Sequence, residues 1–233
     1  MKKPATEENR KILEAYKGLR TADVRDGLDW CGMMHYGSVD ASIRPLYRTI
    51  SIGIARTVRY LPYQGPMPFL TGDDYTQWSA DYYKNVGTFP FIDEIEDGDF
   101  ICIDQSCLNI GLMGSNSALA GKRNGAVGWV SNGGLRDTDE VILEEIAFWS
   151  KEIGQPMVQG RLQFDAKNIP VAIGGVVVYP GDVVVADGDG VVVVPRRLAF
   201  DVAKYARKEL DNDKIGRRKL YKELGMKEDA TVL

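Results

Sequence analysis

The sequence predicts an α/β domain with helices at both ends and a β-rich middle. Residues 5–19 place apolar side chains at helical spacing opposite a charged face. Residues 156–195 are dominated by β-branched runs such as VVVV, which are typical of strands covered on both faces. From residue 196 onward the composition is charged and helical. The chain has no internal repeat or low-complexity linker, so we expect one domain over residues 1–233 that ends in a helical C-terminal arm.

Composition and charge exclude several classes of protein. Hydrophobic residues make up 44% of the chain and charged residues 27%, as in ordinary globular proteins. The net charge of -4 argues against a nucleic-acid partner, because phosphate binding requires clustered Lys and Arg. No apolar run approaches the ~18 residues of a membrane span, and the first residues lack the apolar core of a secretory signal. We therefore expect a cytoplasmic protein with no membrane partner.

The three cysteines, Cys31, Cys102 and Cys107, have no CxxC spacing and are odd in number. This pattern favours reduced, buried cysteines over a disulfide framework or a zinc site.

The N-terminal third is expected to contain two helices followed by strands. Thr21 is a plausible N-cap for a second helix that ends at Gly32. The only histidine, His35, follows in a glycine-flanked loop, where a pocket wall or the surface is more typical than a general base. The alternating and β-branched residues of 44–62 predict one or two strands.

Residues 63–91 are rich in Gly, Pro and aromatic residues and form an excursion from the scaffold, with a short helix around residues 73–84. Long loops in compact domains are usually functional or disordered, and the aromatic density argues against disorder. A pocket lid and a subunit contact are equally compatible with this segment, and one loop can serve both.

The centre of the chain alternates strands and helices. We expect a strand ending at Asp104, a short helix with Gly125 as its C′ residue, and a strand over residues 126–132. Residues 135–154 are expected to begin as a loop and become a helix. Its apolar stripe would comprise Val141, Ile142, Ile146 and Trp149.

Gly114, Ser115, Asn116 and Ser117 precede that short helix. The first turn of a helix presents free backbone N–H groups, which can bind a carboxylate or a phosphate. Ser and Asn at this place also serve as simple helix caps, so the pattern alone leaves both interpretations open.

Arg136 and Asp137 follow a second glycine pair, and Glu140 comes three residues later. An Arg can bind a carboxylate or keto oxygen with paired donors. An adjacent Asp is a hard oxygen ligand for Mg²⁺, and Glu140 could hold a metal-bound water. The alternative is a surface cluster in which acidic residues favour the positive end of a helix dipole.

The chain resembles the RraA-like family, which includes 4-hydroxy-4-methyl-2-oxoglutarate (HMG) aldolase and the regulator of RNase E activity. The matching segments occur in the family's order over roughly residues 20–200. They are TADVRDGLD, IGIARTVR, EDGDFICID, GS followed by NGAVGWVSNGGLRDTDE, and VVVYPGDVVVADGDGVVVVP.

This resemblance implies a β/β/α swivelling-type fold, assembled as a homotrimer or homohexamer with the site near a subunit interface. It also implies class II-type chemistry with Mg²⁺ or Mn²⁺. Asp137 would be the direct metal ligand, and Glu140 a ligand through water. Arg136 would bind the oxo-acid and stabilise its enolate, and residues 114–117 would form the loop that binds its carboxylate.

Ser115, twenty-one residues before Arg136, departs from the aldolase pattern, which has Asp at this place. A serine hydroxyl is a poor general base without a partner. The candidates to replace it are His35, an acidic residue of the excursion such as Asp73 or Asp74, and a C-terminal carboxylate from a neighbouring subunit.

The residues and the resemblance together predict a metal-dependent carbon–carbon lyase. It would cleave a 4-hydroxy-2-oxo acid to pyruvate and a carbonyl compound, or decarboxylate an oxaloacetate-type acid. Two alternatives remain: a non-catalytic regulator of an RNase E-type enzyme, and a metal-dependent hydratase or isomerase of a sugar-derived acid.

Overall fold

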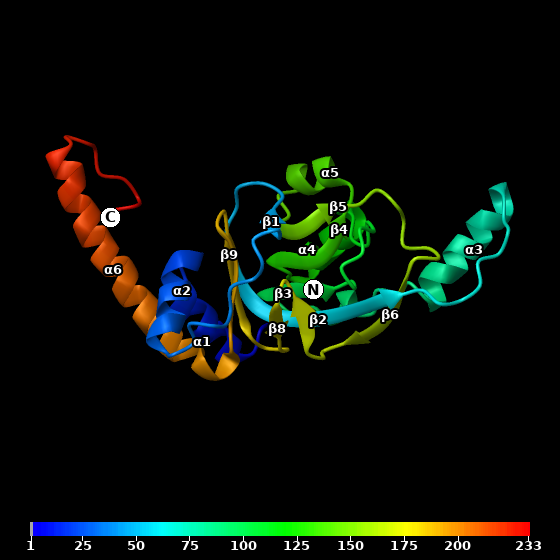
Figure 1. Cartoon of the computed structure of the whole chain (residues 1–233), viewed down its shortest axis with the longest axis horizontal. Helices are drawn as coiled ribbons and strands as arrows, with labels where there is room; N and C mark the ends of the chain where they lie inside the picture. Colours follow the sequence, from blue (N-terminus) through cyan, green and yellow to red (C-terminus); the bar gives the residue numbers. More distant parts are fainter. Residues whose placement is uncertain (1) are drawn as a thin grey trace.

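The computed structural model describes residues 2–233 as a mixed α/β protein with helices at both ends of the chain (Figure 1). The α-helices are α1 Glu7–Tyr16, α2 Thr21–Trp30, α3 Gly72–Asn85, α4 Ser115–Asn124, α5 Thr138–Leu143 and α6 Ala199–Glu223, with short 3-10 turns η1 Ile92–Glu94 and η2 Arg196–Leu198. The strands are β1 Arg44–Pro45, β2 Ser51–Pro62, β3 Asp99–Asp104, β4 Gly128–Leu135, β5 Phe148–Ile153, β6 Leu162–Lys167, β7 Val171–Ile173, β8 Val176–Val178, β9 Val183–Asp187 and β10 Gly190–Val194. The predicted α/β class with terminal helices is confirmed.

One sheet organises the molecule. Its strand order is β1-β5-β4-β3-β2-β9-β10, and β6 also pairs with the long strand β2. Strands β2, β3, β4 and β5 run parallel to one another. The pairs β1–β5, β2–β6, β2–β9 and β9–β10 are antiparallel. Strands β7 and β8 form a separate hairpin.

The parallel arrangement determines where the loops meet. Strands β3 and β4 run side by side in the same direction, with Ile103 opposite Ser131. Parallel strands end at the same edge of a sheet, where α/β proteins commonly place their ligands. The loop after β3 therefore lies beside the end of β4, and Met113 pairs directly with Leu135.

The valine-rich strands β9 and β10 are covered on both faces, as their sequence predicts. Val183, Val185, Val192 and Val194 pack into one core cluster with helices α1, α2 and α6. The alternate residues Val184, Ala186, Val191 and Val193 belong to a second cluster on the other face, which includes the β7–β8 hairpin.

Three helices from the two ends of the chain pack together against this sheet. The buried Tyr16 hydroxyl donates a hydrogen bond of 2.8 Å to the carbonyl of Ala199. An ideal Cβ on Gly27 of α2 would lie 2.6 Å from the Val202 carbonyl oxygen, so only glycine permits this close approach of α2 to α6. Helices α3 and α6 extend from opposite ends of the molecule (Figure 1).

Two local predictions are wrong. Thr21 is the first residue of α2, and Arg20 is the N-cap: its N–H donates to the Asp23 carboxylate at 2.9 Å. The Thr21 hydroxyl instead donates to Asp187 at 2.7 Å, across 166 residues of sequence. A tertiary contact has thus replaced the expected local cap.

The predicted long helix over residues 135–154 is also wrong. Helix α5 ends at Leu143, and Glu145 adopts a positive φ of 52°, which stops the helix. Residues 148–153 form β5, and Trp149 is fully buried there. Its ring N–H donates to the Asp187 carbonyl at 2.9 Å. Parallel pairing with β4 overrides the helical pattern.

The three cysteines are free, as expected, but they differ in environment. Cys102 is buried in β3, and burial raises the pKa of its thiol well above the usual range. Cys31 is half-buried, whereas Cys107 is exposed in the loop after β3, so the expectation of burial is wrong for Cys107. No helix within residues 2–233 has the length and apolarity needed to cross a membrane.

Candidate functional site

A cavity of about 430 Å³ lies where the loop after β3 meets the end of β4. Segments far apart in the sequence line it. The lining residues are Tyr83, Phe89, Gly111, Leu112, Gly114, Asn116, Ser117, Arg136, Asp137 and Met157.

Arg136 and Asp137 form the charged part of this lining. Arg136 Nε donates to Asp137 Oδ1 at 3.1 Å, and about one third of each side chain is exposed. The Arg136 backbone N–H donates to the Met113 carbonyl at 3.0 Å, which joins the two loops. Asp137 has a left-handed φ of 55°, a conformation that Asp tolerates better than most residues. This turn directs the chain into α5.

The glycine loop approaches Asp137 so closely that position 114 has no room for a side chain. An ideal Cβ on Gly114 would lie 2.2 Å from Asp137 Oδ2. The N–H of Ser115 points at the same oxygen, at 3.3 Å. The next N–H groups of the first turn of α4 have no acceptor within the helix, so they remain available to an anion in the cavity.

The structure brings together most of the residues that the sequence nominates. Gly114, Asn116, Ser117, Arg136 and Asp137 share the cavity. Ser115 is adjacent, and its backbone N–H rather than its side chain contacts the charged pair.

The other nominated residues lie elsewhere. Glu140 is exposed on α5 and does not line the cavity. His35 lines a separate pocket beside Arg25 and Asp40. Asp73 and Asp74 are exposed in the first turn of α3 and do not line the cavity. The excursion reaches the cavity through Tyr83 and Phe89 instead.

Sequence reasoning missed the apolar part of the lining. Tyr83 and Phe89 fall within the excursion that was expected to act as a lid or a subunit contact, and their aromatic character was the available signal. Met157 lies between β5 and β6, and no sequence signal marks it.

The buried side chain of Gln105 links the loop after β3 to strand β4. Its Nε2 donates to the carbonyls of Leu108 and Ile110, both at 2.9 Å, in the loop after β3. Its Oε1 accepts a hydrogen bond of 2.9 Å from Ser131 of β4. An ideal Cβ on Gly133 would lie 2.1 Å from Nε2, so glycine makes room for this network.

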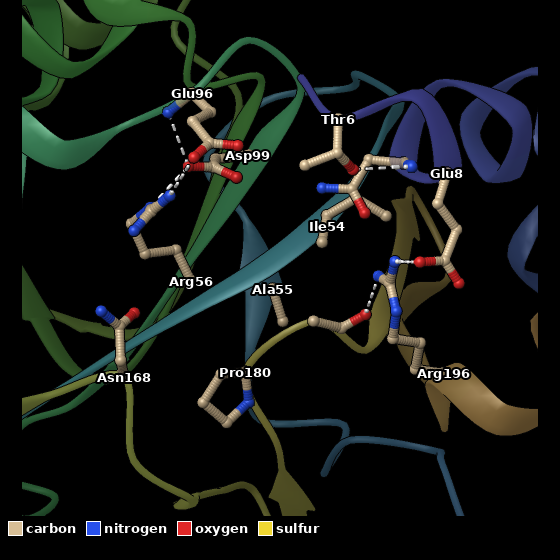
Figure 2. Close-up of a pocket in the computed structure, with 12 residues that line it drawn as sticks. Thr6, Glu8, Ile54, Ala55, Arg56, Glu96, Asp99, Asn168, Pro180 and Arg196 are labelled. Carbon is tan, nitrogen blue, oxygen red and sulfur yellow. Dashed lines mark hydrogen bonds and ion pairs between the residues drawn. The ribbon is translucent and has the colours of Figure 1, made fainter. Parts of the chain in front are cut away.

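A second polar pocket, of about 350 Å³, lies between α1 and β2 (Figure 2). Arg56 Nε donates to the Asp99 carboxylate there at 2.5 Å, and both side chains are largely buried. Burial raises the pKa of Asp99, although Arg56 and the Glu96 N–H act in the opposite direction. Arg196 pairs with Glu8 at 2.8 Å. The Arg56–Asp99 pair therefore joins β2 to β3, and the Arg196–Glu8 pair joins η2 to α1.

The cavity offers few oxygen donors for a divalent metal ion. Asp137 is the one carboxylate in the lining, and its partly exposed oxygens are hard ligands. Within residues 2–233, no three His, Cys, Asp or Glu side chains are close enough to form a complete ligand group. Mg²⁺ commonly takes one or two carboxylates and keeps several waters. An ion here would therefore have Asp137 as its protein carboxylate, with water and ligand oxygens as its other partners.

The fold and this cavity define an α/β protein with a glycine loop at a helix start and an Arg–Asp pair at the carboxyl ends of parallel strands. The family model RraA-like, described as Aldolase/RraA, matches residues 21–193. The chain belongs to the RraA-like family.

Curated relatives match over different shares of their own lengths. The chain is 27% identical to Protein DlpA of Legionella pneumophila over 210 residues, which cover 88% of this chain and 31% of DlpA. It is also 27% identical to a "Putative 4-hydroxy-4-methyl-2-oxoglutarate aldolase" of Halalkalibacterium halodurans, over 89% of this chain and 87% of that protein. Other relatives of the same description match over about half of their length.

Solved structures share the fold. Streptomyces coelicolor RraAS2, described as an unusual member of the RNase ES inhibitor RraA protein family, superposes with a TM-score of 0.69 at 25% identity. The match covers 93% of this chain and 98% of RraAS2.

Proposed function

We propose that this protein is a divalent-metal-dependent lyase of 2-oxo acids. Its preferred reaction is class II-type retro-aldol cleavage of a 4-hydroxy-2-oxo acid to pyruvate, with decarboxylation of an oxaloacetate-type acid as a related activity. The observation that carries the proposal is the shared cavity of Arg136, Asp137 and the first turn of α4. A relative described as a putative aldolase, whose alignment covers 89% of this chain at 27% identity, supports the same reaction class.

Each side chain has a role that follows from its chemistry. The first-turn N–H groups of α4 bind the substrate carboxylate. Arg136 donates to the oxo-acid and offsets the charge that develops on its keto oxygen. Asp137 holds Mg²⁺ or Mn²⁺, with Glu140 as an outer partner through water. When bound, the metal supplies a Lewis acid at the oxo group.

The reaction balances without a redox partner. The C3–C4 bond breaks and its electron pair stays on the C3 side. The C4 hydroxyl loses its proton and becomes a carbonyl, and C3 takes up a proton to give pyruvate. A base is needed only for these proton movements, and Ser115 supplies no carboxylate for them.

Pyruvate release tests the proposal directly. We expect the purified full chain to release pyruvate from 4-hydroxy-2-oxo acids or oxaloacetate when Mg²⁺ or Mn²⁺ is present. Excess EDTA should abolish the release, and adding back the metal should restore it. A lactate dehydrogenase-coupled assay, with EDTA controls on the coupling enzyme, measures the rate. A broad panel of oxo-acids that yields no pyruvate with either metal would exclude this function.

Gly114→Ala should damage the site selectively. The added Cβ displaces the Asp137 carboxylate from its position 2.2 Å away, and a misplacement of this kind typically costs about a hundredfold in rate. Gly216→Ala in α6 is the matched control, because its added Cβ meets nothing within 4 Å. Equal pyruvate release by both variants would show that the close approach of Gly114 to Asp137 is unimportant.

Two alternative functions predict different experimental results. The likeness to RraAS2 favours an RNase regulator as the second candidate. A pull-down with an RNase E-type enzyme, together with absence of pyruvate release, would support that role. A metal-dependent hydratase or isomerase would convert a sugar-derived acid without C–C cleavage, which product identification reveals. For any of them we propose a homotrimer or homohexamer with the cavity near a subunit interface, which light scattering can test.

A further inference from the structure

The cavity beside Arg136 has an apolar part that the proposed reaction does not explain. The apolar wall consists of lining residues from three segments of the chain: Tyr83 and Phe89, Leu112, and Met157. Tyr83 is 38% exposed and Met157 37% exposed. Apolar surface of this kind, inside a cavity with a few polar groups, is typical of a site that covers an apolar part of its ligand.

Buried aromatic rings pack against the aromatic part of the apolar wall. The Phe89 ring lies 6.0 Å from the ring of Tyr60 and 6.4 Å from that of Phe91, centroid to centroid. Tyr60 and Phe91 are both fully buried. Tyr83 stacks on the outer side of Phe89, at 6.3 Å with an interplanar angle of 30°. The wall is therefore largely preformed, and Tyr83 is its outermost and most accessible member.

The charges in the lining match a ligand with a single carboxylate. Arg136 is the one cationic side chain there, and Asp137 is its partner. The first turn of α4 and Arg136 together can satisfy one carboxylate and the adjacent keto oxygen. A second carboxylate beside Tyr83, Phe89 and Met157 would lose water without gaining a cationic partner, which is unfavourable.

We propose that the substrate is a 4-hydroxy-2-oxo monocarboxylic acid that carries an uncharged aryl or alkyl group on C4. This inference rests on the proposed lyase function and narrows it. The same bond cleavage then gives pyruvate and an aryl or alkyl aldehyde. Tyr83 and Phe89 determine the specificity by packing against the C4 substituent.

Binding of unreactive analogues tests the specificity without turnover. Calorimetry with Mg²⁺ compares 2-oxo-4-phenylbutanoate with 2-oxoglutarate, which share the oxo-acid end and differ in the distal group. We expect the phenyl compound to bind at least tenfold more tightly, as in apolar pockets generally. Equal or tighter binding of 2-oxoglutarate, or no binding of either acid, would overturn the proposal.

Variants of Tyr83 test whether the apolar wall is responsible for the preference for the phenyl compound. Tyr83→Ala should weaken binding of 2-oxo-4-phenylbutanoate by about fivefold to tenfold, because an aromatic contact is lost, and should leave pyruvate binding unchanged. Tyr83→Phe is the matched control that keeps the ring and should bind like the wild type. An unchanged affinity in Tyr83→Ala would contradict the assignment, and thermal melting confirms that both variants are folded.

The outcomes separate this inference from the lyase proposal. Pyruvate release from dicarboxylic substrates only would exclude the apolar substrate class while the lyase function stands. Selective phenyl binding without pyruvate release from any 4-hydroxy-2-oxo acid would exclude the lyase, and with it the substrate assignment, while the apolar ligand preference stands.

Discussion

Asp137→Asn should reduce kcat/KM for pyruvate release by about a hundredfold or more, because the metal ion that it would hold could no longer stabilise the developing charge. Asp137 is the only carboxylate in the cavity lining, so its amide leaves no anionic oxygen there for Mg²⁺. Asn also tolerates the left-handed φ of 55° at this position, so the turn into α5 should persist. Initial rates over a range of Mg²⁺ concentrations measure the effect.

Asp139→Asn provides the matched control for this variant. Asp139 lies two residues away, is exposed at the start of α5 and does not line the cavity. It should retain nearly full activity and the same Mg²⁺ dependence. If Asp137→Asn kept wild-type kinetics, or if both variants lost activity equally, Asp137 could not be the metal ligand. Melting temperatures within a few degrees of the wild type would show that the loss is local.

Gln105→Leu should lower the free energy of unfolding by about 3–5 kcal/mol, more than Asp137→Asn. Gln105 is fully buried and satisfies the carbonyls of Leu108 and Ile110 as well as the hydroxyl of Ser131. Leu has a similar size but no polar atoms, so the Ser131 hydroxyl loses its acceptor. The two carbonyls lose one hydrogen bond each but still accept from backbone N–H groups. Each lost hydrogen bond costs about 0.5–1.5 kcal/mol, and the unsatisfied buried hydroxyl costs about 1–3 kcal/mol. Urea unfolding monitored by tryptophan fluorescence gives the difference in unfolding free energy.

Gln77→Leu makes the same chemical change on the exposed face of α3 and should alter stability by less than about 0.5 kcal/mol. The contrast between the two variants isolates the buried network from the loss of an amide as such. A Gln105→Leu protein as stable as the wild type would mean that water or a rearranged loop satisfies these groups, and that Gln105 does not hold the glycine loop against β4.

Local patterns predicted much of the fold. The valine runs predicted strands covered on both faces, and alternate valines of β9 and β10 do pack into two different cores. The helix ending at Gly125 was also predictable, because that residue has a φ of 123° at the C-cap. Patterns failed where a partner distant in sequence decided the outcome. The helical apolar stripe expected from Val141 extends to Trp149, yet residues 148–153 pair with β4 as a strand.

The candidate site divides in the same way. Arg136, Asp137 and the loop at 114–117 could be nominated from sequence because a glycine before a helix start and an Arg–Asp pair are each local patterns, and the family resemblance joined the two. Their meeting in one cavity required parallel strands β3 and β4 to end at the same edge. The roles of Ser115 and Glu140 stay predictions, and the structure places neither side chain in the cavity lining.

By itself, the sequence determined the α/β class, the terminal helices and the charged residues of the candidate site, because these depend on local periodicity and on residue type. Only the tertiary structure decided that Tyr83, Phe89 and Met157 join Arg136 and Asp137 around one space. Their convergence depends on how the excursion and the loop after β5 pack against the sheet, and such long-range packing leaves no periodic signal in the chain. The substrate question therefore rests on the apolar wall, which the fold assembles from three separate segments.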